Sequence, residues 1–340
     1  MKGESSMEIR RVQMTGGSSY IITLPKEWIK KLNIKKNDQV GLITQSDGTL
    51  LVTPKIDRDL VQKIKEFDVS NITNQDFLLR RLIGAYISGF NSIILKSNKR
   101  MSPKVKLTVR KFTQTTIGQE IVEETDTQIL VKDILNPAEM PFDRTIKRMH
   151  MIVKDMHEDI MIAIQKNDKK LAEDVQLRDN EIDRLHWLIA RQHNIILQNV
   201  SFAEKMGITI ELASTSFLIS RIIERIGDHV IRISQNALNI TGNKIPEKVT
   251  EKLENASQTS LDIFNKSIIS FLRRDVEIAN ETIELIKKLE IKLKEINKLA
   301  LNQKGEYVIS LGYIVESIRR IGEYSADISE NVINHVMGEN

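Results

Sequence analysis

The sequence contains no cysteine, and its 340 residues include only 15 glycines and 6 prolines. Without cysteine the chain has no disulfides, no thiolate ligands and no thiol nucleophile, which fits a reducing cytoplasm. Few glycines and prolines disfavour a turn-rich sandwich or barrel and favour long helices. We therefore expect a mainly helical, cytoplasmic protein.

Long apolar segments are missing as well. No run of 18 apolar residues occurs, so we expect no membrane insertion, and the polar start MKGESSMEIRR does not resemble a signal peptide. The 50 basic and 46 acidic residues leave a net charge of only +4, which does not by itself indicate nucleic-acid binding. No P-loop, GxGxxG, GxSxG or HExxH motif occurs, and we expect no enzymatic activity.

Hydrophobic patterning divides the chain into four predicted domains. The first, 1–54, is β-rich, and the second, 55–136, mixes helical and strand periods as a small α+β unit. The last two, 137–242 and 243–340, consist of long amphipathic helices. Strands are predicted at 8–14, 20–24, 40–44, 49–53, 92–96, 119–123 and 128–132, and helices at 26–32, 76–90, 103–115, 141–166, 168–200, 208–240, 246–273, 275–303 and 307–337.

The six long helices form two copies of a three-helix unit. The segment from Arg221 to Asp228 aligns with that from Ser317 to Glu323, and both contain Arg-Ile-Gly in register. An internal repeat of this size predicts two stacked bundles. Gly227 lies inside a strongly helical run, where glycine costs about 1 kcal/mol relative to alanine. We expect it to allow the close approach of another helix or of a bound ion.

Acidic pairs four residues apart mark the first copy. Asp179 and Asp183 share one face of the second helix, and Glu224 and Asp228 share one face of the third. Oxygen ligands from facing helices suit hard cations, iron or manganese. The alternative is local ion pairing with Arg178, Arg221 and Arg232, and the spacing alone leaves both interpretations open.

The second copy retains less of this pattern. Glu323 and Asp327 still form an acidic pair, but Arg319 occupies the position of Glu224 and Ile286 that of Asp179. A cationic side chain among the acids replaces a metal electrostatically. We expect the second site to be weakened or lost.

Basic residues are the candidates in the first domain, where eight Lys and Arg and five Asp and Glu give residues 1–54 a net charge of +3. A two-fold dimer would double such patches, and a β-unit can present them to DNA. An ordinary charged surface is the alternative. The candidate DNA contacts are Arg10, Arg11, Lys26, Lys30 and Lys31.

The stretch VQMTGGSSYIITLPKEW at 12–28, followed by LNIKKNDQV at 32–40, resembles the SpoVT/AbrB swapped-hairpin family. This resemblance implies an intertwined homodimer that binds DNA. DNA-binding members commonly have a basic residue before the ITLP segment, whereas this chain has Ser18, Ser19 and Tyr20. Dimerisation without DNA binding therefore remains an alternative.

Residues 137–338 resemble PhoU, a regulator of phosphate uptake, in the segments DNEIDRL from Asp179, ERIGDH from Glu224 and RRIGEY from Arg319. The resemblance implies two three-helix bundles whose E(D)xxxD motifs bind multinuclear metal, with iron, manganese, zinc or magnesium as candidates. The implied ligands are Asp179, Asp183, Glu224 and Asp228, together with Glu323 and Asp327 by spacing only.

These observations favour a non-enzymatic regulator of phosphate uptake. Its head would bind operator DNA, and its helical body would sense phosphate status through metal and through partners such as phosphate ABC transporter subunits or regulatory proteins. The second hypothesis is a peripheral adaptor that acts on the transporter without binding DNA. The third, a carboxylate-bridged metal enzyme, lacks the Glu-x-x-His motifs expected of di-iron enzymes.

Overall fold

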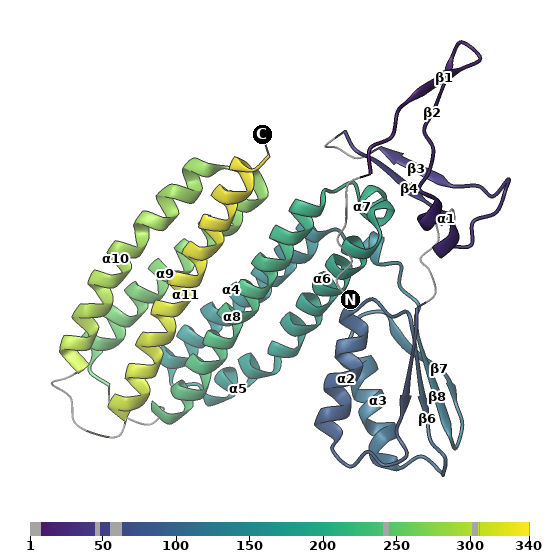
Figure 1. The fold of residues 1–340 in the computed structure, drawn as a ribbon. Helices are drawn as coiled ribbons and strands as arrows, with labels where there is room; N and C mark the ends of the chain where they lie inside the picture. The colour runs from purple at the N-terminus through teal and green to yellow at the C-terminus, as the bar shows by residue number, and fades with distance from the viewer. Residues whose placement is uncertain are drawn as a thin grey trace. The chain divides into compact units, whose positions relative to one another are not determined.

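The computed structural model describes residues 8–44, 48–54, 63–240, 245–300, 305 and 307–339. The chain forms two compact units, residues 1–61 and 62–340. Its fold class is the predicted one, with a small β-rich region, an α+β unit and a mainly helical remainder (Figure 1). None of the described helices is both long and apolar enough to cross a membrane.

The first unit contains two hairpins and one short helix. Strand β1 (Gln13–Thr15) pairs antiparallel with β2 (Ser19–Ile21), and β3 (Gly41–Thr44) pairs with β4 (Leu50–Thr53). Helix α1 (Lys26–Lys31) follows Pro25 and buries no residue. Apolar side chains stay exposed throughout this unit, including Val12, Met14, Tyr20, Leu42 and Leu50. This unit therefore lacks an apolar core of its own among its described residues.

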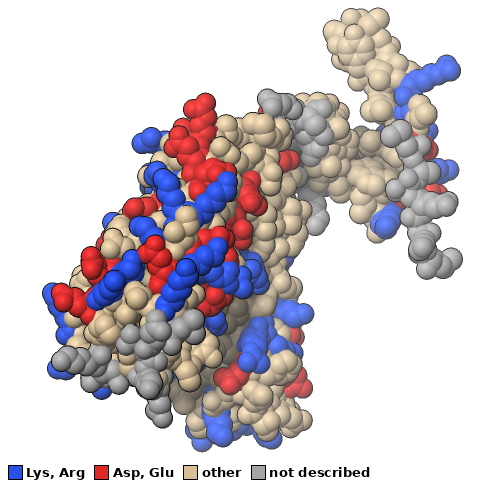
Figure 2. All heavy atoms as spheres, turned by 90° about the vertical axis from the view of Figure 1, so that its left-hand side faces the viewer, with Lys and Arg blue, Asp and Glu red and all other residues tan. Residues whose placement is uncertain are grey.

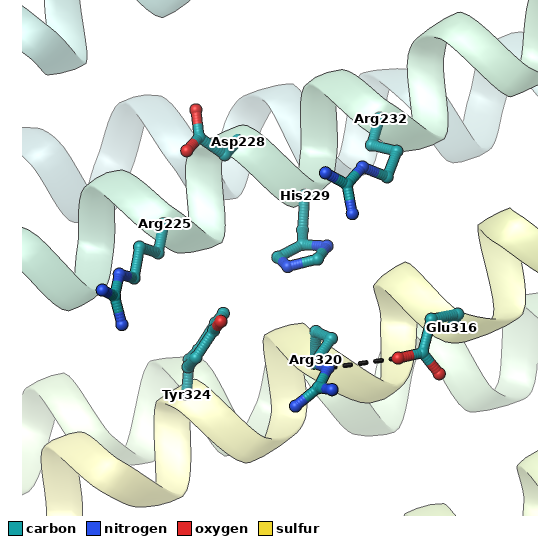
Figure 3. Close-up of a pocket in the computed structure, with 7 residues that line it drawn as sticks. All are labelled: Arg225, Asp228, His229, Arg232, Glu316, Arg320 and Tyr324. Atoms are coloured by element: carbon teal, nitrogen blue, oxygen red, sulfur yellow. Dashed lines mark hydrogen bonds and ion pairs between the residues drawn. The ribbon is translucent and has the colours of Figure 1, made fainter.

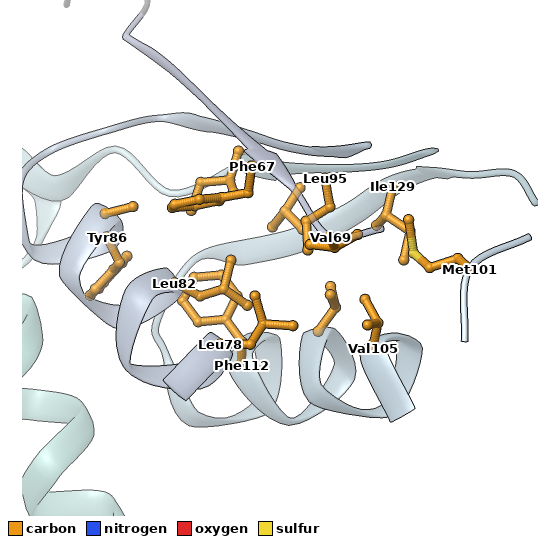
Figure 4. Packing of buried hydrophobic residues seen from close by; sticks show 14 residues of the cluster. Phe67, Val69, Leu78, Leu82, Tyr86, Leu95, Met101, Val105, Phe112 and Ile129 are labelled. Carbon is orange, nitrogen blue, oxygen red and sulfur yellow. The ribbon is translucent and has the colours of Figure 1, made fainter. Parts of the chain in front are cut away.

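The α+β unit begins the second compact unit with a four-stranded sheet in the order β5-β6-β8-β7. Its strands are β5 (Ile64–Asp68), β6 (Ser92–Lys96), β7 (Gln119–Glu124) and β8 (Gln128–Asp133). Helices α2 (Gln75–Ile87) and α3 (Pro103–Thr115) begin at the side-chain caps Asn74 and Ser102. A buried cluster that includes Leu82, Phe112 and Ile129 joins helices and sheet (Figure 4).

Helices form the rest of the chain. A short 3-10 helix, η1 (Pro137–Glu139), precedes α4 (Phe142–Lys166), α5 (Lys169–Leu177), α6 (Asp179–Gln198), α7 (Val200–Met206) and α8 (Ile210–Ile240). The second group consists of α9 (Glu247–Arg273), α10 (Val276–Ala300) and α11 (Tyr307–Met337). Left-handed residues end α4 and α9 at Asn167 and Arg274.

Several predicted boundaries are wrong. The single helix predicted at 168–200 is interrupted at Arg178 and forms α5 and α6, and the short helix α7 follows. Strand β5 was not predicted, because the only core residue in IKEFD is Phe67, and so the segment lacks a clear period of two. The first predicted strand is shorter than expected, so Arg10 and Arg11 precede β1 instead of lying on it.

Equivalent helices of the two copies face each other. Helix α4 contacts α9, and α8 packs along α11. At the first contact, His157 is buried and lies 2.6 Å from the Ser257 hydroxyl, while His150 lies 2.8 Å from the Asn265 side-chain oxygen. Burial lowers the pKa of His157 to about 4, so its ring is neutral at pH 7. These histidines are packing residues at the contact between α4 and α9.

Helix α6 also anchors the α+β unit. The Arg191 side chain is only 2% exposed and pairs with Asp133 at 2.7 Å. It donates further hydrogen bonds to the backbone carbonyls of Tyr86 and Phe90. A buried charge needs such partners, because removal of one partner leaves the other desolvated and unpaired. This network fixes the α+β unit against the same helix that carries Asp179 and Asp183.

Candidate acidic site between α6 and α8

Gly227 brings α8 close to α6. A Cβ atom at this position would lie 2.9 Å from Cδ1 of Ile182, so only a glycine fits without a shift of that side chain. The sequence left close helix approach and ion binding as alternative reasons for this glycine, and the structure supports the first. Because Ile182 lies between Asp179 and Asp183, the contact also brings the two acidic pairs together.

Four carboxylates influence one another across this contact. Burial, followed by the charges of Asp179, Glu224 and Asp228, raises the pKa of Asp183 to about 7. Burial also raises the pKa values of Asp179 and Glu224, and the charge of Asp228 adds to both effects. The pKa of Asp228 is raised by burial and lowered in part by Arg232 and Arg225. The cluster is therefore an electrostatically unfavourable group of partly buried acids.

Ion pairing does not account for these acids. Within the described ranges, none of the four carboxylates has a salt bridge within 4.0 Å. Arg178, the expected partner of Asp179, instead pairs with Asp159 at 2.7 Å and with Asp174 at 2.5 Å. Arg221 and Arg232 act on Glu224 and Asp228 only through longer-range attraction. The local ion-pair interpretation is therefore not supported at these positions.

The donor set fits a hard cation, because it consists of carboxylate oxygens from two facing helices. In the part of the chain that the structure describes, however, no three His, Asp or Glu side chains are placed to hold a metal ion. Cation binding would require these side chains to turn toward a common point.

The second bundle has the corresponding glycine but different charges. A Cβ at Gly322 would lie 2.3 Å from Cδ2 of Leu289 on α10, which matches the contact at Gly227. Arg319 forms ion pairs with Glu316 and Glu323, and Arg320 contacts both acids at 3.1 Å. Glu323 is thus neutralised by side chains of its own helix.

Asp327 is less well compensated than Glu323. Burial raises its pKa, and the charges of Glu330 and Glu323 add to the rise. The structure therefore separates the two acids that the spacing paired, because Glu323 is bound by arginines and Asp327 is not.

The basic residues singled out in the first unit lie on its surface. Arg10 pairs with Glu8, and Lys26, Lys30 and Lys31 are exposed on α1. The segment from Val12 to Pro25, which includes the β1–β2 hairpin, contains no charged residue. Any contact of this hairpin with phosphates would therefore come from backbone and hydroxyl groups.

Sequence reasoning missed two arginines and a histidine on the other side of α8. Arg225, His229 and Arg232 follow the spacing i, i+4, i+7, which puts them on one helix face, and they line a pocket between α8 and α11. That spacing was the available signal. On the face shown in Figure 2, basic and acidic side chains are otherwise interspersed over the helical part.

Comparison with known proteins supplies the remaining evidence. The model of the PhoU domain matches residues 146–237 and 253–332, which together make up about half of the chain. The model described as antidote-toxin recognition MazE, bacterial antitoxin, matches residues 13–59.

Similar proteins cover the same helical part. A phosphate-specific transport system accessory protein PhoU homolog of Xylella fastidiosa is 24% identical over 201 residues, covering 57% of this chain and 83% of its own. A homolog of the same description from Thermotoga maritima is 23% identical over 208 residues, covering 57% and 85%. The crystal structure of PhoU from Pseudomonas aeruginosa matches 58% of this chain and 96% of its own, with 18% identity and a TM-score of 0.52. This structural likeness supports the helical fold described above for the matched part of the chain.

Proposed function

Since this chain belongs to the PhoU family, we propose that it is a non-enzymatic regulator of phosphate uptake whose body senses phosphate status through metal and partner proteins. The observation that carries the proposal is the match of both three-helix repeats to the PhoU domain. Similar proteins named as accessory proteins of phosphate-specific transport support it. The proposed partners are the phosphate ABC transporter or regulatory proteins that act with it in the cytoplasm.

The proposed metal site is the acidic cluster of the first bundle. Asp179 and Asp183 on α6, with Glu224 and Asp228 on α8, would hold a multinuclear centre of iron, manganese, zinc or magnesium. The raised pKa values support this assignment, because a bound cation would remove the repulsion that raises them. In this regulator the metal would order the facing helices and carry out no chemical step. Glu323 and Asp327 are weaker candidates, because Glu323 is already bound by arginines.

The head is proposed to form a homodimer that binds DNA. Its dimerisation is supported by apolar side chains that remain exposed in one chain, such as Val12, Tyr20 and Leu42. A second copy of residues 8–54 would cover this surface and double the charge of Arg10, Arg11 and α1. The likeness of residues 13–59 to the MazE antitoxin family supports an interaction domain of this type.

Light scattering on the full chain and on a chain lacking residues 1–55 tests dimerisation. We expect loss of the dimer in the shortened chain, because the described head residues form no core of their own. A fully dimeric shortened chain would instead show that the bundles hold the protomers together.

Quantitative gel shifts test DNA binding, with the protein's own promoter and phosphate-transport promoters against an unrelated duplex of equal length. We expect a sequence preference that persists as salt rises, and a smaller salt slope after Arg10→Ala with Arg11→Ala. Arg100→Ala with Arg273→Ala, at exposed positions of the second unit, is the matched control. Unchanged affinity of the Arg10 and Arg11 variant would remove these residues from the interface.

An adaptor without DNA binding is the second candidate function. The absence of charged residues from Val12 to Pro25 favours it, since the hairpin then offers no cation to phosphates. Failure of the full chain to bind any tested promoter, together with a stable dimer, would support this second function. Co-purification with phosphate transporter subunits would then identify the partner.

A further inference from the structure

The helical part contains a pocket of about 540 Å³ between α8 and α11. Arg225, His229 and Arg232 line it from α8, while Arg320 and Tyr324 line it from α11 (Figure 3). Its volume falls within the roughly 300–1,000 Å³ typical of small-molecule sites. The two helices belong to different bundles, so the pocket lies where the two copies of the repeat meet.

The pocket and the acidic cluster share one residue, Asp228 on α8. In Figure 3, Asp228 lies on the opposite side of α8 from the side chains of Arg225, His229 and Arg232. Asp228 also lines the pocket, and its charge acts on Asp179 of α6. Helix α8 therefore contributes acids to the cluster with α6 and arginines to the pocket with α11, and Asp228 takes part in both.

Two of the three arginines are not neutralised. Arg320 contacts Glu316 and Glu323 at 3.1 Å each, and Arg319 pairs with the same two acids. Arg225 and Arg232 have no ion-pair partner within 4.0 Å among the residues the structure describes. Arg225 instead lies 5.9 Å from the centroid of the Tyr324 ring. The pocket lining therefore sets three arginines against the carboxylates of Asp228 and Glu316, and two of these arginines keep no direct ion-pair partner among the described residues.

Unused hydrogen-bonding capacity lies in the same place. The Nδ1 atom of His229 is buried and has no hydrogen-bond partner in the described structure. The guanidinium groups of Arg225 and Arg232 also retain donors that no described side chain accepts. Guanidinium groups match the oxygens of a phosphoryl group with two parallel hydrogen bonds each.

We propose that the pocket between α8 and α11 binds the phosphoryl group of a small anion. Arg225 and Arg232 supply guanidinium groups that have no ion-pair partner within 4.0 Å among the described residues, and Arg320, held in place by Glu316, supplies a third guanidinium group from the opposite helix. Free orthophosphate, a diphosphate and a nucleoside triphosphate share this chemistry, and the pocket has room for all three. The proposal stands on the charges and shape of the pocket and does not rest on the proposed regulatory function.

Isothermal titration calorimetry on the chelator-treated full chain tests the proposal. The probes are orthophosphate, pyrophosphate and ATP at constant ionic strength, with citrate as a multiply charged anion that lacks phosphorus. We expect saturable binding of at least one phosphoryl probe with one site per chain, and the tightest probe identifies the source of the phosphoryl group. Absence of binding by all three probes, or equally tight binding of citrate, overturns the proposal.

Variants locate the site. Arg225→Gln with Arg232→Gln should weaken binding at least about tenfold, because each loses hydrogen bonds to a charged ligand. Arg100→Gln with Arg273→Gln removes the same charge from exposed positions and should leave affinity unchanged. Equal losses in the two double variants would overturn the proposal, since binding would then follow net charge alone.

Two further variants separate folding and metal effects from ligand binding. Arg232→Lys keeps the charge but not the planar fork, and we expect intermediate affinity. Asp183→Asn alters the acidic cluster and should leave phosphoryl binding unchanged. Loss of binding in Asp183→Asn, with the fold intact by circular dichroism, would show that residual metal in the acidic cluster holds the anion and would overturn the pocket assignment.

Discussion

The two bundles share one type of helix contact but differ in the charges beside it. In each, a glycine on the third helix meets an apolar side chain of the second, Gly227 with Ile182 and Gly322 with Leu289. Beside Gly227 the acids remain unpaired, and the pKa of Asp183 rises to about 7. Beside Gly322 the helix supplies its own arginines to neutralise Glu323.

This difference shows that helix packing and surface chemistry are specified by separate residues. The packing contact needs only a small residue on one helix and a branched apolar residue on the other. The charges one position and three positions away can then change without disturbing the contact. A repeated bundle can therefore retain its fold while one copy keeps an unfavourable cluster of partly buried acids and the other copy does not.

The largest expected change in stability comes from placing an arginine in the first bundle at the position equivalent to Arg319 of the second. With Mn²⁺ or Fe²⁺ at 100-fold above its dissociation constant, bound metal should raise the free energy of unfolding of the wild type by about 2.7 kcal/mol. Glu224→Arg should abolish this increase, because it places a cation among the ligands as Arg319 does in the second bundle. Thermal melts with and without chelator, supported by elemental analysis, measure the effect.

Glu281→Arg is the matched control for this exchange. It makes the same charge change at an exposed position of α10, so it should keep the metal-dependent stabilisation. A wild type that melts at the same temperature with and without every tested metal would rule out the acidic cluster as a metal site.

A smaller change in the free energy of unfolding is expected when the pH of the metal-free protein is varied. The pKa of Asp183 is about 7 in the folded chain and near 4 when unfolded, so the folded state holds more protons between these values. Stability contributed by the protonated acid is therefore present at low pH and is lost as pH rises from about 4 to 7. Across this window the free energy of unfolding of Asp183→Asn should rise by about 2 kcal/mol relative to wild type. This is less than the energy equivalent of the full pKa shift, because solvent screens the group.

Chemical denaturation at several pH values, with chelator present, measures this difference. Burial lowers the pKa values of three histidines, His157, His186 and His229, to about 4. The folded state therefore binds fewer protons than the unfolded state, and the free energy of unfolding falls as pH falls from about 6.5. Those contributions oppose the one from Asp183 but are common to both proteins, so they cancel in the difference. Asp262→Asn, at an exposed position of α9, is the matched control. A flat difference profile for Asp183→Asn would contradict the raised pKa.

In the second bundle, removal of a charged side chain should lower the free energy of unfolding, whereas Asp183→Asn in the first bundle should raise it. Arg319→Gln removes a partner from Glu316 and Glu323, whose charges then rest on Arg320 alone. We expect a loss of about 1 kcal/mol in metal-free protein, since the pairs are partly exposed. The same replacement of the unpaired Arg225 should not destabilise the chain. Equal losses at the two positions, measured by urea denaturation, would show that the second bundle gains nothing from its ion pairs.

Much of this organisation is readable from the sequence, because helical periodicity and the Arg-Ile-Gly repeat reflect packing that extends over many residues. The interruption at Arg178 was missed because this residue stays near helical geometry, with φ −79° and ψ −13°, and no glycine or proline marks it. The acidic residues were found from their i, i+4 spacing. The spacing of Arg225, His229 and Arg232 puts them on one face of α8, but the pocket was missed because it forms only where α11 packs against that face.

The smallest expected effects test the shared glycine contact itself. Gly312 lies in α11 with nothing within 4 Å of a Cβ atom, so Gly312→Ala should stabilise the chain by about 1 kcal/mol through helix propensity alone. Gly227→Ala and Gly322→Ala should gain less or lose stability, because their Cβ atoms would lie 2.9 Å from Ile182 and 2.3 Å from Leu289. Urea denaturation of the three variants gives the comparison, with Gly312→Ala as the reference for propensity. An equal gain at all three positions would mean that the facing side chains move aside freely, and the glycines would then not be what holds each pair of helices at its short distance.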